Sequence, residues 1–143
     1  GNKLPFGNAS IDISISRNFL MHLSIQDLEY HLKETARILN KGRYVVAVLN
    51  PEYEQRKYKL LHPNKPNLKN GQRYEFTHGA KGEGGFFYHY FKTTEHYEKL
   101  FKKHFEIIDK KSCIPITDEF KNTHERYYWK DCPMAFVYEL KKK

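Results

Sequence analysis

The sequence predicts an α/β fold, and three consecutive patterns between residues 11 and 49 carry that prediction. Residues Ile11 to Ser16 alternate apolar and polar, which is typical of a strand with one buried face. Apolar residues then recur every three or four positions from Ile25 to Leu39, as on one face of a helix. Tyr44 to Leu49 is a continuous apolar run, which indicates a fully buried strand. Strand, helix and strand at this spacing form a right-handed βαβ unit with parallel strands.

Local signals mark both ends of the predicted helix. Ser24 and, three residues later, Asp27 resemble a capping box, in which a hydroxyl and a carboxylate bind free backbone amides. Asn40 and Lys41 are followed by Gly42, which is expected to end the helix in the left-handed conformation that glycine adopts without strain.

Shorter elements are expected in the second half of the chain. One helix should run from Glu52 to Leu61 with Pro51 near its first turn, and another should be capped by Thr93. The capped helix would bury one face, made by Tyr97, Leu100 and Phe101. Phe105 to Asp109 and Met134 to Leu140 are expected to form two strands that pair antiparallel.

An aromatic hairpin is predicted between these helices. Arg73 to His78 and Phe86 to Phe91 both resemble aromatic-rich strands, and the glycine-rich segment Gly79 to Gly85 would be a mobile connection. That segment superficially resembles a nucleotide-binding glycine turn. Such a turn requires a following helix, whereas the pattern of a strand follows here, so a hairpin loop is the better interpretation.

Composition bounds the class of protein. A chain of 143 residues, 39% hydrophobic and 15% aromatic, suits one folded domain. Its net charge of +8 favours anionic partners, although the lysines are scattered as on a solvated surface. Cys113 and Cys132 are isolated, which is typical of a reduced cytoplasmic protein. No apolar run reaches the roughly 18–20 residues that span a bilayer, so membrane binding is not expected.

The order of several short motifs resembles one known family. Leu4-Pro5-Phe6 precedes a strand that carries Asp12, and a segment ending in Met21-His22-Leu23 leads into the helix. Phe91-Lys92-Thr93 then precedes another helix, and Cys132 to Val137 is similar to the family's final strand. This series resembles the carboxyl-terminal half of the class I S-adenosylmethionine-dependent methyltransferases. The chain departs from the pattern where the family has proline and a second glycine after the first helix, and where His104 replaces a glycine.

The resemblance implies a partial Rossmann-like methyltransferase fold. Its sheet would hold strands four to seven of a seven-stranded sheet, with the last strand antiparallel, flanking helices and the aromatic hairpin. Residues 1–143 would form a single domain, with the glycine-rich cofactor-binding half lying before Gly1. In relatives, the segment just before the leucine-proline-phenylalanine motif contacts the adenine. We therefore expect weak or absent binding of S-adenosylmethionine, and no methyl transfer, from this chain alone.

The resemblance also places candidate site residues at the carboxyl ends of the parallel strands, where ligands bind in such folds. Cofactor contacts are expected from Ser16, Arg17 and Asn18, and His22 is the candidate general base. The candidates for binding a small-molecule acceptor are Asn50, Tyr53, Tyr88 and His89. Two alternatives stay open: His22 could serve only to bond the backbone at the helix entry, and the hairpin aromatics could simply pack on the sheet.

Other functions compete with methyl transfer. His78, His89 and His96 could approach one another, but no H-x-x-x-H or H-E-x-x-H pattern occurs, so no metal site is predicted. Basic residues interleaved with aromatics at Arg73 to Phe76 and Phe87 to Tyr90 could stack RNA bases, which makes a basic RNA-binding module an alternative. A third hypothesis is that the chain is a non-catalytic structural remnant.

Partners follow from the expected place of the first strand. Ile11 to Ser16 would be an exposed edge if the first strands of the sheet are not part of this chain. Either two copies should then pair along this edge as a homodimer, or a separately encoded amino-terminal half should cover it.

Overall fold

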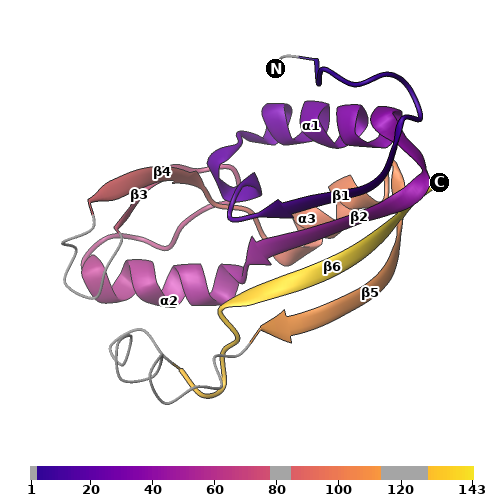
Figure 1. The fold of residues 1–143 in the computed structure, drawn as a ribbon. Coiled ribbons are helices and arrows are strands. Elements are labelled where there is room, and N and C mark those ends of the chain that lie inside the picture. The colour runs from indigo at the N-terminus through magenta and orange to yellow at the C-terminus, as the bar shows by residue number, and fades with distance from the viewer. Residues whose placement is uncertain (1–2, 78–84, 114–128) are drawn as a thin grey trace.

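The computed structural model describes residues 3–77, 85–113 and 129–143, which contain both helices and strands (Figure 1). In chain order the elements are β1 (Ile11–Arg17), the 3-10 turn η1 (Leu20–His22), α1 (Ile25–Ile38), β2 (Leu39–Leu49), α2 (Pro51–Leu61), β3 (Arg73–Thr77), β4 (Phe86–Tyr90), α3 (Thr94–Phe101), β5 (Phe105–Cys113) and β6 (Ala135–Lys142). The predicted order of strands and helices is therefore confirmed, although β2 begins at Leu39 instead of Tyr44 and β5 ends at Cys113 instead of Asp109.

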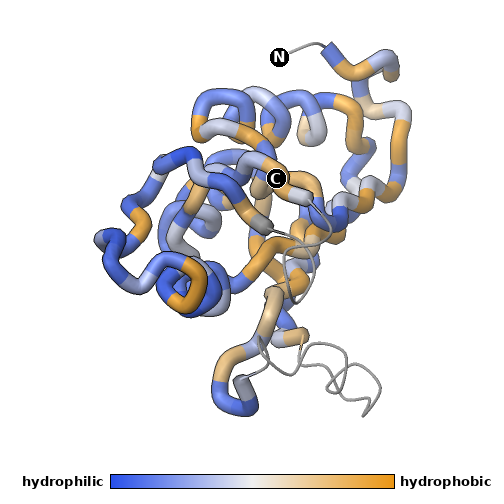
Figure 2. The backbone as a smooth tube through the Cα atoms, turned by 90° about the vertical axis from the view of Figure 1, so that its left-hand side faces the viewer, coloured by the Kyte–Doolittle hydropathy of each residue, from blue (hydrophilic) through white to orange (hydrophobic). Residues whose placement is uncertain are grey.

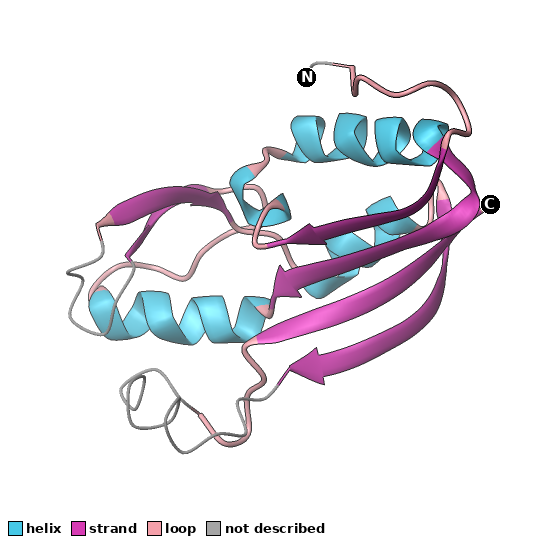
Figure 3. Cartoon of the chain, viewed as in Figure 1, coloured by secondary structure: helices cyan, strands magenta, loops and turns pink. Residues whose placement is uncertain are grey.

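The main sheet has four strands in the order β1-β2-β6-β5. β1 and β2 are parallel and neighbours, as predicted for the two strands that the first helix joins. β6 lies between β2 and β5 and is antiparallel to both, which confirms the pairing expected for the last two strands. β3 and β4 form a separate antiparallel hairpin, which lies beyond the carboxyl ends of β1 and β2 (Figures 1 and 3).

One face of the sheet carries the larger apolar core. Leucines of α1 and aromatic residues of α3 pack against Tyr44 and Val46 of β2 and against Tyr138 and Leu140 of β6. Hydrophobic and hydrophilic segments alternate along the coils of the backbone (Figure 2), as expected where each helix buries one stripe and exposes the other. Packing on the helix-backed face therefore fixes the positions of β1 and β2, at whose carboxyl ends the candidate site residues lie.

Capping side chains begin the helices where the sequence predicted. The Ser24 hydroxyl accepts from the Asp27 amide at 3.1 Å and donates to the Asp27 carboxylate at 2.6 Å. Thr93 likewise accepts from the His96 amide at 3.2 Å at the start of α3. Because each cap satisfies an amide that lacks a helical partner, these two starts are fixed locally.

The end of α1 differs from the prediction. The helix ends at Ile38, and Gly42 already belongs to β2, while Lys41 takes the left-handed conformation with φ 49°. A Cβ on Gly42 would lie 1.9 Å from the backbone oxygen of Asp12 in β1. Gly42 is therefore needed for the close approach of two strands rather than for a helix cap.

The buried face of β1 is the opposite of the expected one. Ser14 and Ser16 pair with Tyr44 and Val46 on the core face, whereas Ile13 and Ile15 are 62% and 72% exposed. The Tyr44 hydroxyl donates to Ser16 Oγ at 2.8 Å. The buried phenol needs a polar partner, and Ser16 of the edge strand supplies one.

β2 is also less buried than its apolar run predicted. Val46 and Val48 are buried, but Val45 and Ala47, on the same face as Ile15, are only half-buried. An unbroken apolar run indicates a strand covered on both faces. In the described residues of this chain, only the helix-backed face of β2 is covered that completely.

Arg37 of α1 fixes the segment that precedes β1. Its guanidinium donates to the carbonyls of Leu4 at 3.1 Å and Phe6 at 2.9 Å, and to the Asn8 side chain at 2.9 Å. Oε2 of the Glu34 carboxylate lies 2.8 Å from Nη2 of the same guanidinium and forms an ion pair with it. The leucine-proline-phenylalanine motif is thus tied to α1.

Candidate active site

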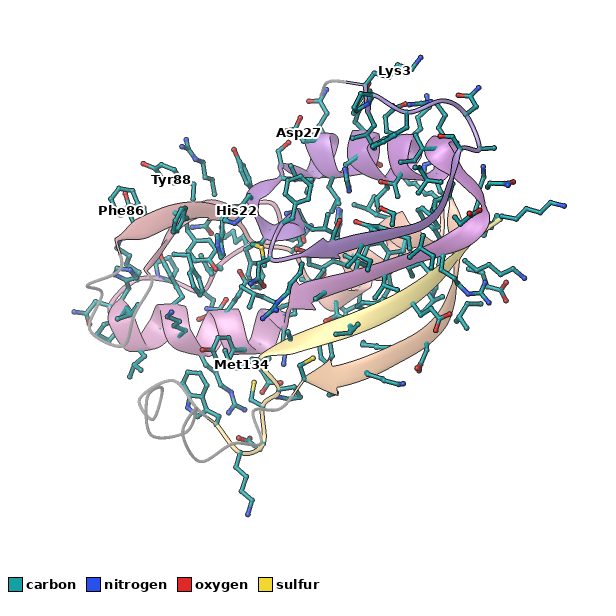
Figure 4. All side chains as sticks on the ribbon, viewed as in Figure 1. Lys3, His22, Asp27, Phe86, Tyr88 and Met134 are labelled. Carbon is teal, nitrogen blue, oxygen red and sulfur yellow. The ribbon has the colours of Figure 1, made fainter. Side chains whose placement is uncertain are left out.

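The carboxyl end of β1 and the hairpin meet at η1, the short turn that carries His22. β1 ends at Arg17, Asn18 follows in the left-handed conformation with φ 52°, and η1 begins at Leu20. The turn lies against β4, so His22 comes beside Tyr88 and His89 of the hairpin (Figure 4). Three of the predicted site residues, distant in sequence, are therefore neighbours in the fold.

The hydrogen bond of His22 defines which ring nitrogen carries a proton. Its Nδ1 lies 3.1 Å from the backbone oxygen of Tyr88. A carbonyl oxygen only accepts, so Nδ1 carries the hydrogen and, in the neutral ring, Nε2 keeps its lone pair. The side chain is exposed. This imidazole can accept a proton from a bound molecule, and the backbone bond that sequence reasoning left as an alternative is what orients it.

His89 is buried beside His22. The two ring centres are 4.8 Å apart with the planes at 83°, and the His89 ring stacks on Phe76 at 4.3 Å. His89 is 2% exposed. Burial, together with the nearby His22, Lys92 and Lys57, lowers the pKa of His89 to about 3. His89 therefore stays neutral at physiological pH.

A buried carboxylate of α2 faces His89. Oε1 of Glu54 lies 3.6 Å from His89 Nδ1 and accepts a hydrogen bond from the Tyr74 hydroxyl at 2.5 Å. Glu54 is 1% exposed, and burial raises its pKa to about 7, against the opposing effects of Tyr74 and Lys92. Both protonation states of Glu54 are accessible near neutral pH.

Lys92 is a further buried charge close to Glu54 and His89. It is 0% exposed, and its ammonium donates to the carbonyls of Leu20 at 3.2 Å and Tyr90 at 3.0 Å. Burial lowers the pKa of Lys92 to about 8, and the Glu54 carboxylate opposes that shift. We use "the buried polar cluster" for Glu54, Tyr74, His89 and Lys92.

Sequence reasoning missed three members of the buried polar cluster, namely Glu54, Tyr74 and Lys92. One signal was available for Glu54, because it lies four residues before Tyr58 and seven before Leu61, on the stripe of α2 that faces the hairpin. No local pattern marks Lys92, since its burial depends on η1, which is far away in the sequence.

Asn50 and Tyr53 have structural partners at the start of α2. The Asn50 side chain accepts from the Glu52 amide at 3.0 Å and donates to the Pro133 carbonyl at 2.8 Å, and Asn50 is 4% exposed. Tyr53 is 3% exposed, and its ring lies 5.4 Å from that of Trp129. They lie at the carboxyl end of β2, but neither lies in the contact between His22 and His89.

The three predicted cofactor contacts lie at the end of β1. Ser16 is half-buried and accepts from Tyr44, whereas Arg17 and Asn18 are exposed. Within the part of the chain that the structure describes, the side chains of Arg17 and Asn18 have no hydrogen bond. They are accessible to a ligand at this end of the sheet.

Two expectations from the sequence fall partly outside the described residues. His78 of the considered histidine group and most of the glycine-rich connection lie within residues 78–84. Among residues 3–77, 85–113 and 129–143, no group of three or more potential metal ligands comes together. The helices within those ranges are all too short or too polar to cross a membrane.

The aromatic residues considered for RNA stacking divide between the two faces of the hairpin. Tyr74 and Phe76 are 7% and 8% exposed, so they do not present their rings to bases, which corrects that part of the RNA hypothesis. On the other face, the Arg73 guanidinium lies 3.7 Å from the centre of the half-exposed Tyr88 ring.

Comparisons with known proteins show which family model and which folds this chain is similar to. Residues 1–47 match the family model described as a methyltransferase domain. No curated protein sequence matches the chain. Among solved structures, an S-adenosylmethionine-dependent methyltransferase of Methanosarcina mazei is 18% identical with a TM-score of 0.67, and 98% of this chain covers 63% of that one.

Two further structures show the same fold. A putative S-adenosylmethionine-dependent methyltransferase of Listeria monocytogenes is 14% identical with a TM-score of 0.66, and 98% of this chain covers 65% of it. Geranyl diphosphate C-methyltransferase of Streptomyces coelicolor is 17% identical with a TM-score of 0.57, and 99% of this chain covers 49% of it. This chain thus spans about half to two thirds of the length of these enzymes. The family model matches residues 1–47, and the fold of this chain is similar to that of part of these S-adenosylmethionine-dependent methyltransferases.

Proposed function

We propose that this chain is the carboxyl-terminal half of a methyltransferase that acts on a small-molecule acceptor. In this assignment β1 and β2 are the fourth and fifth strands of the seven-stranded family sheet, and β5 and β6 are the sixth and seventh. The order β1-β2-β6-β5, with β6 antiparallel between two neighbours, supports the assignment. The observation that carries the function is the pairing of His22 with His89 at the carboxyl end of β1.

The family's cofactor is S-adenosylmethionine, which supplies a methyl group on a sulfonium, a leaving group that needs no further activation. Ser16, Arg17 and Asn18 would contact it from the end of β1. The exposed positions of Arg17 and Asn18 fit this role, and Ser16 Oγ accepts from Tyr44, which leaves its own hydroxyl hydrogen to donate. These residues alone supply few contacts, so we expect weak or no binding by the isolated chain.

His22 is the proposed general base for an acceptor that loses a proton when it is methylated. Nε2 of His22 takes up that proton, and the ring becomes an imidazolium whose Nδ1 hydrogen stays bonded to the Tyr88 carbonyl. His89 favours this step because it is neutral and adds no positive charge beside the ring. Positioning does the remaining work, since alignment and exclusion of water dominate methyl transfer.

The proposed acceptor is small and at least partly apolar. The Phe87 ring lies 6.0 Å from His22 and is 52% exposed, and the half-exposed Tyr88 is on the same strand. Asn50 and Tyr53, which are buried, would act indirectly on the acceptor by shaping the carboxyl end of β2. The name of the Streptomyces relative states a small acceptor, geranyl diphosphate, for that enzyme.

The open edge at β1 supports a further partner. Ile13 and Ile15 are exposed on an edge strand, which favours coverage by an amino-terminal half, with pairing of two copies as the alternative. Sedimentation of the chain at rising concentration separates them. A dimer whose formation slows amide exchange in β1 supports self-pairing, and a monomer with fast exchange there supports coverage by an amino-terminal half.

Calorimetry with S-adenosylhomocysteine tests the proposed function. We expect no measurable heat from the isolated chain and saturable binding once the segment encoded directly upstream is joined to it. That segment should contain a strand, a glycine turn and an acidic residue about 20 residues later. Absence of binding by the joined protein would count against the proposal, and Arg17→Ala, which should weaken binding, serves as the site control.

RNA binding is the second candidate, favoured by one observation. The Arg73 guanidinium over the Tyr88 ring, beside the 55% exposed Phe86, presents a cation and aromatic rings on the outer face of the hairpin. Affinity for single-stranded RNA that falls steeply with salt, and that Tyr88→Ala weakens, would support it. No binding at low salt would end it.

A further inference from the structure

Lys92 joins the two elements that carry the paired imidazoles. Leu20, whose carbonyl accepts from the Lys92 ammonium, begins η1 with His22 at its end. Tyr90, the second acceptor, ends β4 one residue after His89. A single buried side chain therefore links the turn to the strand, from beneath the site rather than within it.

Packing alone does not account for a lysine at this position. A fully buried ammonium loses its hydration, and an apolar side chain of similar length would fill the same space without that loss. The ammonium instead donates to two carbonyls that belong to two separate elements, η1 and β4. Charge-assisted hydrogen bonds of this kind are stronger than neutral ones.

Charges of both signs face Lys92 from the surrounding elements. Glu54 of α2 attracts the Lys92 ammonium. The charge of Lys92 acts on His89 of β4 and on His96 of α3, and the charge of Lys57 in α2 also acts on His89. The rings of Tyr90 and Tyr97 lie 5.8 and 5.6 Å from its ammonium. Glu54 is the opposite charge that allows Lys92 to remain an ammonium inside the protein.

We propose that Lys92 is a positioning residue, which fixes η1 against β4 so that His22 donates from Nδ1 to the Tyr88 carbonyl and keeps the Nε2 lone pair for the acceptor. This proposal rests on the proposed role of His22 as a base. Its structural content is separate, because the tautomer of His22 exists without cofactor or acceptor. If η1 were loosened, the His22 ring could rotate, and the neutral ring would populate both the Nδ1–H and the Nε2–H tautomer.

The test is the tautomer of His22 in the full chain, measured by long-range ¹H–¹⁵N imidazole spectra at about pH 7.5. We expect the Nδ1–H form to dominate in the wild type. Lys92→Met should lower the ratio of the Nδ1–H to the Nε2–H form at least about five-fold, the effect of weakening one hydrogen bond. An unchanged ratio in a folded K92M variant would overturn the proposal.

Lys57→Met is the matched control. Lys57 is another buried lysine, 6% exposed, whose ammonium lies 4.0 Å from the centre of the Phe76 ring. K57M should alter stability but leave the His22 tautomer as in the wild type. An equal change of tautomer in K57M would show that general loosening, rather than the link through Lys92, sets the ring, and would also overturn the proposal.

A second pair of variants applies if K92M does not fold, because that variant leaves Glu54 buried without its opposite charge. Glu54→Gln removes the carboxylate, and the double variant E54Q/K92M removes both charges. The double variant should lose the Nδ1–H preference relative to E54Q. Failure of methyl transfer in the completed enzyme, with this tautomer result intact, would sink the proposed function while leaving the positioning role of Lys92 standing.

Discussion

The helix-backed face of the sheet and the contact between α2 and the hairpin bury different chemistry. The first is an apolar core in which leucines and aromatic rings of α1 and α3 pack on β2 and β6. The second encloses Glu54, Lys57, His89 and Lys92, all at most 6% exposed, among aromatic rings. Ionisable groups buried this deeply are not needed to build a core, and they gather where groups are positioned for chemistry. The sheet thus supplies an apolar core, and the hairpin region buries the ionisable groups of the candidate site.

The largest expected effect separates the apolar core from the exposed hairpin face. Phe101→Ala removes a ring that is 0% exposed and should lower the free energy of unfolding by about 3–5 kcal/mol. Phe86→Ala, at a ring 55% exposed, should cost about 0.5 kcal/mol or less. Urea unfolding measures both. Similar losses in the two variants would break the distinction between the regions.

The buried carboxylate gives the hairpin region a pH dependence. Below pH 4.5, the ordinary pKa of a glutamate, Glu54 is protonated in both folded and unfolded chains; its folded pKa is about 7. Between these values only the unfolded chain loses the proton, so the wild type loses stability as pH rises. Relative to E54Q, we expect that loss to reach about 3 kcal/mol at pH 8.

Urea unfolding of the wild type and E54Q from pH 4 to 8 checks this. A difference that stays constant across the range would contradict the buried position of Glu54. Glu75→Gln, at an exposed residue of β3, provides the control and should show no such trend.

Adding a methyl group at Gly42 tests the close contact between β1 and β2. Gly42→Ala places a Cβ 1.9 Å from the Asp12 backbone oxygen, so the strands must separate there. We expect a loss of about 2 kcal/mol and faster amide exchange at the start of β1. Gly7→Ala meets no atom closer than 3.9 Å and should be neutral. A neutral G42A would refute the observed register.

The smallest expected effect tests the inverted face of β1. Ser16→Ala removes the acceptor of the Tyr44 hydroxyl and should cost about 1 kcal/mol, since His31 lies within 3.2 Å as an alternative partner. Ile15→Ala, at a side chain 72% exposed, should cost less than about 0.5 kcal/mol. Thermal unfolding that ranks the isoleucine as the costlier loss would show that the apolar side is the buried one.

Features specified by neighbouring residues could be predicted from the sequence. The Ser24 hydroxyl accepts from the Asp27 amide, and the Thr93 hydroxyl accepts from the His96 amide. Each pair lies within one helical turn, so both helix starts can be predicted from neighbouring residues. The strand alternation and the intervening glycines likewise predicted the hairpin. The parallel pairing of β1 with β2 followed from the connecting helix.

Features that depend on distant partners could not be predicted. The alternation in β1 does not show which side faces the core, because that is decided by the Tyr44 hydroxyl of the next strand. The role of Gly42 likewise depends on Asp12. For the site, His22 and His89 were predicted separately, but the buried charges of Glu54 and Lys92 that surround them arise only when α2, η1 and β4 meet.

A titration with S-adenosylhomocysteine, followed in amide and imidazole spectra of the chain joined to its upstream segment, tests most directly whether the ligand binds at the carboxyl end of β1. We expect the largest shifts at Ser16 to Asn18 and at His22, where β1 ends. The opposite end of the parallel strands, at Ile11 and Lys41, should not move. Shifts centred on that opposite end, or absent from Ser16 to Asn18, would contradict binding at the carboxyl end of β1.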